Sequence, residues 1–80
     1  MSGLPQISGK DLIRVLAKLG YEVVRQRGSH VRLQKNTSLG MHKITVPVHK
    51  EMAKGTLNDI LTKISFWNAI PKEELIRLLK

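Results

Sequence analysis

The first patterned stretch of the chain predicts a helix over Gly9–Leu19. Its apolar residues recur every three or four positions, which places them on one side of a helix. These residues are Leu12, Ile13, Leu16, Ala17 and Leu19. Ser8, with Asp11 three residues later, has the chemistry of a helix N-cap, and Gly20 suits the left-handed residue that follows a helix. Residues 1–7, before this helix, are expected to form a short arm.

Residues 21–49 alternate between apolar and polar side chains, which predicts three strands. The strands are expected over Tyr21–Arg27, His30–Lys35 and Lys43–His49. Turn-forming residues stand between them, at Gly28-Ser29 and at Asn36–Gly40. Three short strands joined by tight turns form an antiparallel meander with one apolar and one polar face.

The last third of the chain predicts two further helices. The first is marked by an i, i+3, i+4, i+7 stripe that consists of Leu57, Ile60, Leu61 and Ile64. Thr56 is expected to cap this helix, and Phe66 and Trp67 to lie in a connector after it. Pro71 suits the first position of a short last helix over residues 71–80.

These elements predict an α+β fold with the order α-β-β-β-α and a short C-terminal helix. The helices should cover the apolar face of a three-stranded antiparallel sheet and leave its polar face open. Pro47 has no N–H to donate, so its strand is expected at an edge of the sheet. Eighty residues are expected to form a single domain over 1–80.

Length and composition exclude several classes of protein. A chain of 80 residues has no second domain to wall a cofactor-sized cavity, which argues against dehydrogenases and kinases. Cysteine is absent, which excludes disulfide scaffolds, thiolate zinc sites and thiol nucleophiles, and fits a reducing cytoplasm. No apolar run approaches the ~20 residues that span a bilayer and no signal peptide opens the chain, so a cytoplasmic protein without a membrane partner is expected.

The charge of the chain is strongly positive and unevenly placed. Fourteen Lys and Arg stand against six Asp and Glu, a net charge of +8. Nearly all of the excess lies in residues 1–50, and no acid occurs between Val23 and Lys50. A polyanion such as a nucleic acid is the natural partner for such a segment, although a solvated basic face kept for solubility has the same composition.

His30 is the strongest candidate for catalysis. It follows the Gly28-Ser29 turn and shares the predicted polar face with Arg32. Neighbouring positive charge disfavours the imidazolium form, so a neutral ring that can accept a proton is expected near pH 7. Such a histidine could take the proton of an RNA 2′-hydroxyl while the cations stabilise the phosphate. The residues expected to contact RNA are Arg25, Arg27, Ser29, Arg32, Lys43 and Lys10.

Other interpretations of these residues stay open. His30 could be a surface histidine that contacts phosphate without chemistry, which would make the protein a non-catalytic module of the double-stranded-RNA-binding type. A protein-interaction domain with an apolar patch near Trp67 is a third class. A metal site is disfavoured, because the spacing of His30, His42 and His49 matches no metal-binding motif.

Four segments together resemble the HicA (YcfA-like) toxin family. They are Ser8–Leu12, Val24–His30, Thr45–His49 and Lys54–Leu61, which occur in the family's order within residues 8–64. The segment Val24–His30 is the most distinctive of them. The chain departs from the family in two places, with Val31 where many members carry a second histidine and with residues 64–68 at the end of the second helix.

This resemblance implies a fold like the double-stranded-RNA-binding domain and the function of an mRNA interferase. The toxin of a type II toxin–antitoxin pair would cleave mRNA as an endoribonuclease, without a metal ion or other cofactor, and a HicB-like antitoxin would hold it inactive. The family's catalytic histidine follows Gly-Ser, which corresponds to His30.

Overall fold

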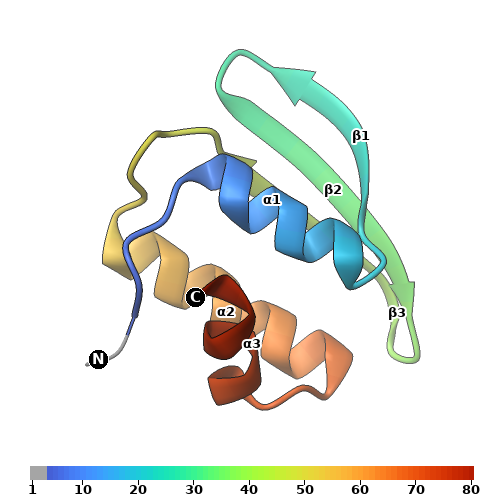
Figure 1. Cartoon of the computed structure of the whole chain (residues 1–80). Helices are drawn as coiled ribbons and strands as arrows, with labels where there is room; N and C mark the ends of the chain where they lie inside the picture. The colour runs from blue at the N-terminus through green and yellow to red at the C-terminus, as the bar shows by residue number, and fades with distance from the viewer. Residues whose placement is uncertain (1–3) are drawn as a thin grey trace.

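The computed structural model describes residues 4–80 and has the element order α-β-β-β-α-α (Figure 1). The elements are α1 Gly9–Lys18, β1 Glu22–Arg27, β2 His30–Thr37, β3 Gly40–Pro47, α2 Lys54–Asn68 and α3 Lys72–Leu79. The strands form one antiparallel sheet in the order β1-β2-β3. The predicted α+β fold is therefore confirmed, and β3, which ends at Pro47, lies at an edge as expected.

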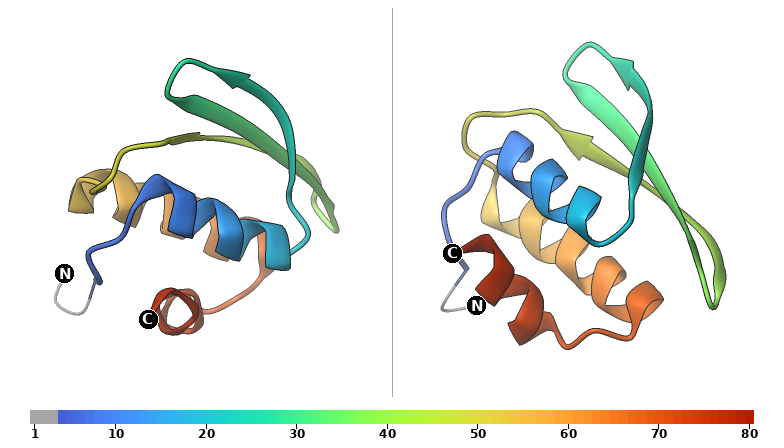
Figure 2. Two further views of the ribbon diagram at one scale, coloured as in Figure 1. Left: turned by 45° about the horizontal axis from the view of Figure 1, so that its top comes forward. Right: turned by 45° about the vertical axis from the view of Figure 1, so that its right-hand side comes forward.

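The molecule has three layers (Figure 2). The sheet covers one side of α1 and α2, and α3 lies against these two helices on the side away from the sheet. The alternating strands place their apolar side chains toward the helices, where they meet the helical stripes. The most deeply buried side chains are Leu12, Leu16, Leu33, Val46, Leu57, Leu61, Ile64 and Leu75. In the part of the chain that the structure describes, no helix covers the opposite face of the sheet (Figure 2).

The predicted caps of α1 are confirmed. The Ser8 hydroxyl accepts a hydrogen bond from the Asp11 N–H at 3.1 Å, and the Asp11 carboxylate accepts one from the Ser8 N–H at 3.4 Å. Gly20 follows the C-cap residue Leu19 with φ of +105°. A left-handed glycine ends the helix, as the sequence pattern indicates.

Several predicted boundaries are wrong. The second hairpin is longer than expected, since β2 runs to Thr37 and β3 already begins at Gly40. β3 also ends at Pro47 and not at His49. Polar turn-forming residues therefore occupy strand positions, because pairing across the hairpin satisfies their backbone groups as a turn would.

The ends of the later helices also differ from the expected ones. Phe66 and Trp67 lie inside α2, which continues to Asn68 and ends at Ala69 with φ of +52°. Thr56 does not cap α2, because the helix already begins at Lys54 with Ala53 in the cap position. Pro71 is the N-cap residue of α3 and not its first helical residue.

The described part of the predicted N-terminal arm packs on the body of the protein. Leu4 and Ile7 belong to the buried core, and the Ile7 carbonyl accepts a hydrogen bond from the Met52 N–H at 2.9 Å. Residues 1–3 of the arm lie outside the described residues. The segment before α1 therefore contributes to the core beside the loop that leads into α2.

Gly9 holds the start of α1 tightly against the end of β3. A Cβ atom at this position would overlap the carbonyl oxygen of Pro47 and crowd the Cα of Val48. The Gly9 N–H donates to the His49 carbonyl at 2.9 Å. The absence of a side chain thus allows two backbone segments to touch, and this contact fixes the loop that follows β3.

Candidate functional site

A bulge in β1 decides which of its side chains reach the open face of the sheet. Val23 lies opposite Leu33, whereas Arg25 lies opposite Arg32, so Val24 is an extra residue in the ladder. Strict alternation from Val23 would have turned Arg25 toward the helices. The bulge shifts the alternation by one residue and brings Arg25 onto the open face.

This open face gathers cations around His30. We call it the outer face and define it by Arg25, Arg27, His30, Arg32, Gln34, Lys43 and Thr45. Arg27 lies directly opposite His30, and Arg25 directly opposite Arg32, on the paired strands β1 and β2. Thr45 of β3 lies opposite Arg32 on the other side. Three strands therefore each contribute a polar side chain to one small area.

A shallow hollow of about 180 Å³ lies in this area, and we call it the His30 hollow. It is lined by Arg25, Arg27, His30, Arg32 and Thr45. All five side chains are exposed to solvent. An open hollow with three guanidinium groups suits the phosphate of a large substrate, because guanidinium offers paired donors to phosphate oxygens.

The turn before His30 is held in place by two hydrogen bonds to its backbone carbonyls. Gly28 has φ of +58°, a left-handed conformation that a residue with a side chain adopts less readily, and its carbonyl accepts from the Gln26 side chain at 3.3 Å. The Ser29 carbonyl accepts from the Val48 N–H at 2.6 Å. The loop after β3 thus braces the turn from which His30 emerges.

The structure brings together most of the expected RNA-contacting residues but separates one of them. Lys43 lies on the outer face opposite Gln34, and Ser29 lies in the turn beside His30. Lys10 lies on the helix side of the sheet, in hollows apart from the His30 hollow. One of these is lined by Lys10, Ile13, Val23, Gln26, Val31 and Val48, and the adjoining one by Ser8, Lys10, Val48, His49 and Lys50.

Thr45 is the site residue that sequence reasoning did not single out. The alternation of the third strand places Thr45 on the polar side with Lys43, and this was the available signal. The pairing of β2 with β3, which the alternation does not determine, puts it next to Arg32.

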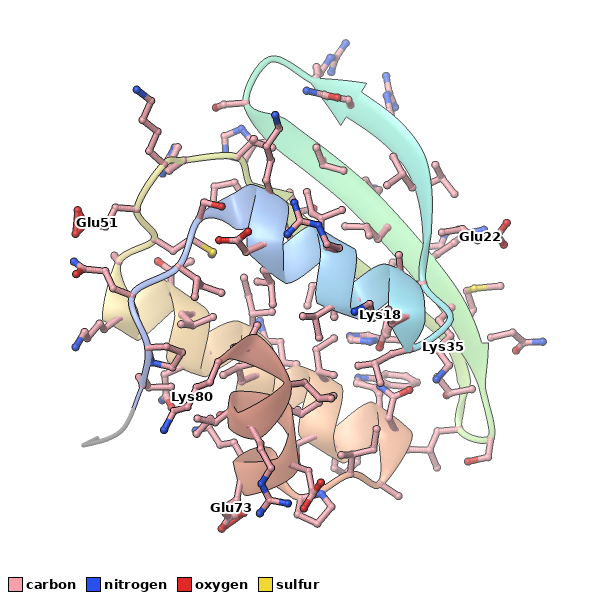
Figure 3. The ribbon with its side chains drawn as sticks, in the orientation of Figure 1. Lys18, Glu22, Lys35, Glu51, Glu73 and Lys80 are labelled. Atoms are coloured by element: carbon pink, nitrogen blue, oxygen red, sulfur yellow. The ribbon has the colours of Figure 1, made fainter. Side chains whose placement is uncertain are left out.

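Among residues 4–80, no acidic side chain forms an ion pair with the arginines of the His30 hollow. The two ion pairs among the described residues join Asp11 to Arg14 at 3.1 Å and Glu74 to Arg77 at 2.7 Å, both within helices. The acid nearest in sequence to the hollow's β1 arginines is Glu22, which lies opposite Gln34 on the same face of the sheet but at the far end of β1 (Figure 3). The positive charge of the hollow is therefore free to attract an anion.

His42 has a different environment from His30. Only 5% of its surface is exposed, and its ring stacks on Trp67 with the centroids 4.8 Å apart. Its Nδ1 atom lies 2.6 Å from the Tyr21 hydroxyl, which in turn accepts from the Asn68 side chain at 2.9 Å. The hydroxyl and the ring nitrogen can each donate or accept, so this hydrogen bond links Tyr21 to His42 in either tautomer of the ring.

Charge and burial both favour the neutral form of His42. Burial lowers the pKa of His42, and the nearby Lys63 ammonium lowers it further. Lys35 reaches from β2 to the Asn68 side chain and adds another cation to this end of the molecule (Figure 3). His42 is thus a core residue that ties β3 to α2 and not a partner of His30.

The lowered pKa of His42 predicts that mild acid destabilises the fold. Between the lowered pKa and the ordinary value near 6.5, the unfolded chain binds more protons than the folded one, so stability is complete above about pH 6.5 and falls below it. Urea midpoints at pH 7.5 and 5.5 measure the effect. We expect the midpoint to fall in the wild-type protein and to fall less in His42→Gln. Equal falls in both proteins would show that another group is responsible.

Neither a cluster of metal ligands nor a membrane-spanning helix occurs among the described residues. Between residues 4 and 80, no three histidine, aspartate or glutamate side chains gather in a way that could hold a metal ion. No helix in this range combines the length and apolar character needed to cross a membrane.

Comparison with known proteins places the chain in a family. The family model described as HicA toxin of bacterial toxin-antitoxin matches residues 9–65, which is well over half of the chain. The matched part contains α1, all three strands and most of α2, and so includes the His30 hollow. No curated protein and no solved structure matches. The resemblance indicated by the four sequence segments is thereby confirmed, and the chain belongs to the HicA family of toxins from bacterial toxin–antitoxin pairs.

Proposed function

We propose that this toxin is an endoribonuclease that cleaves mRNA, with His30 as its general base. The observation that carries the proposal is the placement of His30 among Arg25, Arg27 and Arg32 in one exposed hollow. Membership in the toxin family supports a role in stopping the growth of its own cell. The open outer face supports a substrate that is long and polyanionic.

The chemistry requires one proton acceptor, because RNA carries its own nucleophile. His30 accepts the proton of a ribose 2′-hydroxyl, and the 2′-oxygen forms a bond to the adjacent phosphorus. The bond from phosphorus to the 5′-oxygen of the next nucleotide breaks, and that oxygen takes a proton from water. The products are a 2′,3′-cyclic phosphate and a 5′-hydroxyl. The proposal needs no metal ion for this step.

The arginines of the hollow stabilise the charge that builds up during this reaction. Two non-bridging oxygens gain negative charge as the fifth bond to phosphorus forms, and guanidinium donors placed in advance lower that barrier. Arg27 faces His30 directly across the hairpin, and Arg25 and Arg32 form the next pair. This arrangement holds the phosphate beside the base.

Family membership implies a cognate antitoxin as the protein partner. We propose that it is HicB-like and presents acidic side chains to the outer face. Such a protein would cover the His30 hollow and compete with RNA for the same arginines. A protein-interaction role is thus part of the toxin's regulation and not its activity.

A substrate with one altered ribose tests the proposed reaction. An RNA oligonucleotide that the protein cuts at a mapped bond should resist cleavage when the ribose at that bond is 2′-deoxy, and cleavage of the unmodified RNA should persist in EDTA. Cleavage of the 2′-deoxy substrate at the same bond would refute the mechanism. Binding that weakens steeply with salt, with no cleavage in any buffer, would favour the non-catalytic RNA-binding module.

A further inference from the structure

Thr45 is the one hydroxyl-bearing side chain in the His30 hollow. Its neighbours there are three arginines and His30. Its hydroxyl makes no hydrogen bond to any residue from 4 to 80, whereas the hydroxyls of Thr37 and Thr62 bond to backbone carbonyls of their own turn or helix. The Thr45 hydroxyl is exposed and available to a ligand of the hollow.

The chemistry of Thr45 differs from that of its neighbours in a way that matters for RNA. Guanidinium groups only donate hydrogen bonds, so they suit phosphate oxygens. A threonine hydroxyl both donates and accepts, and so does a ribose 2′-hydroxyl. The 2′-hydroxyl is also the group by which a protein distinguishes RNA from DNA. Within the hollow, Thr45 is the one hydroxyl group that matches it.

The sheet register places Thr45 one step away from His30. His30 pairs with Pro47, and Thr45 lies two residues before Pro47 on β3. Such diagonal neighbours on one face of a sheet stand about 7–8 Å apart. This separation is comparable with the step between successive riboses along a strand, so His30 and Thr45 are spaced to contact the riboses of adjacent nucleotides.

We propose that Thr45 binds the 2′-hydroxyl of the nucleotide next to the one whose 2′-hydroxyl His30 deprotonates. The inference rests on the proposed endoribonuclease function and goes beyond it. It gives the enzyme a requirement for ribose at a second position, which the chemistry of cleavage does not demand. Thr45 is then a substrate-specificity residue of the outer face.

A cycle of one protein change and one substrate change tests this contact. The protein variant is Thr45→Val, which keeps the branched shape that suits a strand. Each substrate carries a single 2′-deoxy nucleotide, either immediately before or immediately after the nucleotide whose 2′-hydroxyl attacks the phosphate. For one of these substrates we expect kcat/KM of the wild-type protein to be about two- to tenfold lower than for the all-ribose RNA, as for a lost hydrogen bond. In Thr45→Val the same 2′-deoxy substitution should cause no further loss of kcat/KM.

The control variant is Thr56→Val. Thr56 is exposed on α2, and its hydroxyl likewise makes no hydrogen bond to the described residues, but it lies outside the His30 hollow. We expect Thr56→Val to respond to the 2′-deoxy substrates as the wild-type protein does. This variant separates a contact in the hollow from a general effect of losing a threonine hydroxyl.

The outcomes distinguish this inference from the function on which it rests. If the adjacent 2′-deoxy substitutions slow wild-type and Thr45→Val equally, or slow neither, Thr45 does not bind a 2′-hydroxyl. A loss in Thr45→Val that is the same for every substrate would likewise overturn the inference, since it would indicate a structural role. If the substrate with a 2′-deoxy ribose at the cleaved bond is still cut there, the endoribonuclease mechanism itself is wrong.

Discussion

Replacing His30 with alanine is expected to lower the rate of RNA cleavage by about 10²–10⁴-fold, the usual contribution of a general base. His30 is exposed at the start of β2 and lies in the hollow with three arginines. Its removal leaves these arginines able to bind phosphate, so RNA affinity should change much less than the rate. Single-turnover cleavage of a labelled RNA, together with binding to a 2′-deoxy analogue that resists cleavage, measures both quantities.

His49→Ala is the matched control for His30→Ala. His49 is also an exposed histidine, it lies in the loop that braces the turn before His30, and it lines a neighbouring hollow. Each variant should unfold within about 0.5 kcal/mol of the wild-type protein, as is usual for exposed positions. Only His30→Ala should lose cleavage. Wild-type cleavage by His30→Ala, or equal losses in both variants, would remove His30 from the catalytic role.

The polar and apolar faces of β2 and β3 were predictable because their alternation is regular. Val31 and Leu33 are buried and His30 and Arg32 are exposed, as the pattern indicates. The face on which Arg25 lies was not predictable in the same way. It depends on the bulge at Val24, and nothing in the local composition marks the extra residue. All six residues of β1 are exposed, so no burial pattern reveals its register.

The cluster around His42 was missed for a different reason. His42 falls between the predicted turn at Asn36–Gly40 and the predicted strand over Lys43–His49, and Trp67 falls where a connector was expected. The two residues meet because β3 turns His42 toward the helices and α2 extends far enough for Trp67 to stack on its ring. Contacts of this kind join residues far apart in the sequence, and a local pattern does not contain them.

Replacing Gly9 with alanine is expected to destabilise the protein by about 1–3 kcal/mol, the usual cost of forcing an atom into a packed interior. The added Cβ would meet the carbonyl oxygen of Pro47 and the Cα of Val48. Both are backbone atoms, so neither can rotate away as a side chain could. The start of α1 would have to separate from the end of β3 and stretch the hydrogen bond from the Gly9 N–H to the His49 carbonyl. Chemical denaturation at pH 7.5 measures the loss.

The sign of this effect identifies its cause, because helix propensity alone predicts the opposite. Alanine is favoured over glycine in helices by about 1 kcal/mol. Gly55 lies in the first turn of α2, and no atom stands within 4 Å of the place that a Cβ would take there, so Gly55→Ala should be neutral or stabilising. If Gly9→Ala also stabilised the protein, the close contact with β3 would not exist in solution.

The same contact connects Gly9 to the turn before His30, because the N–H of the neighbouring Val48 bonds to the Ser29 carbonyl. Gly9→Ala should therefore also slow cleavage while the fold persists, whereas Gly55→Ala should leave the rate of cleavage unchanged.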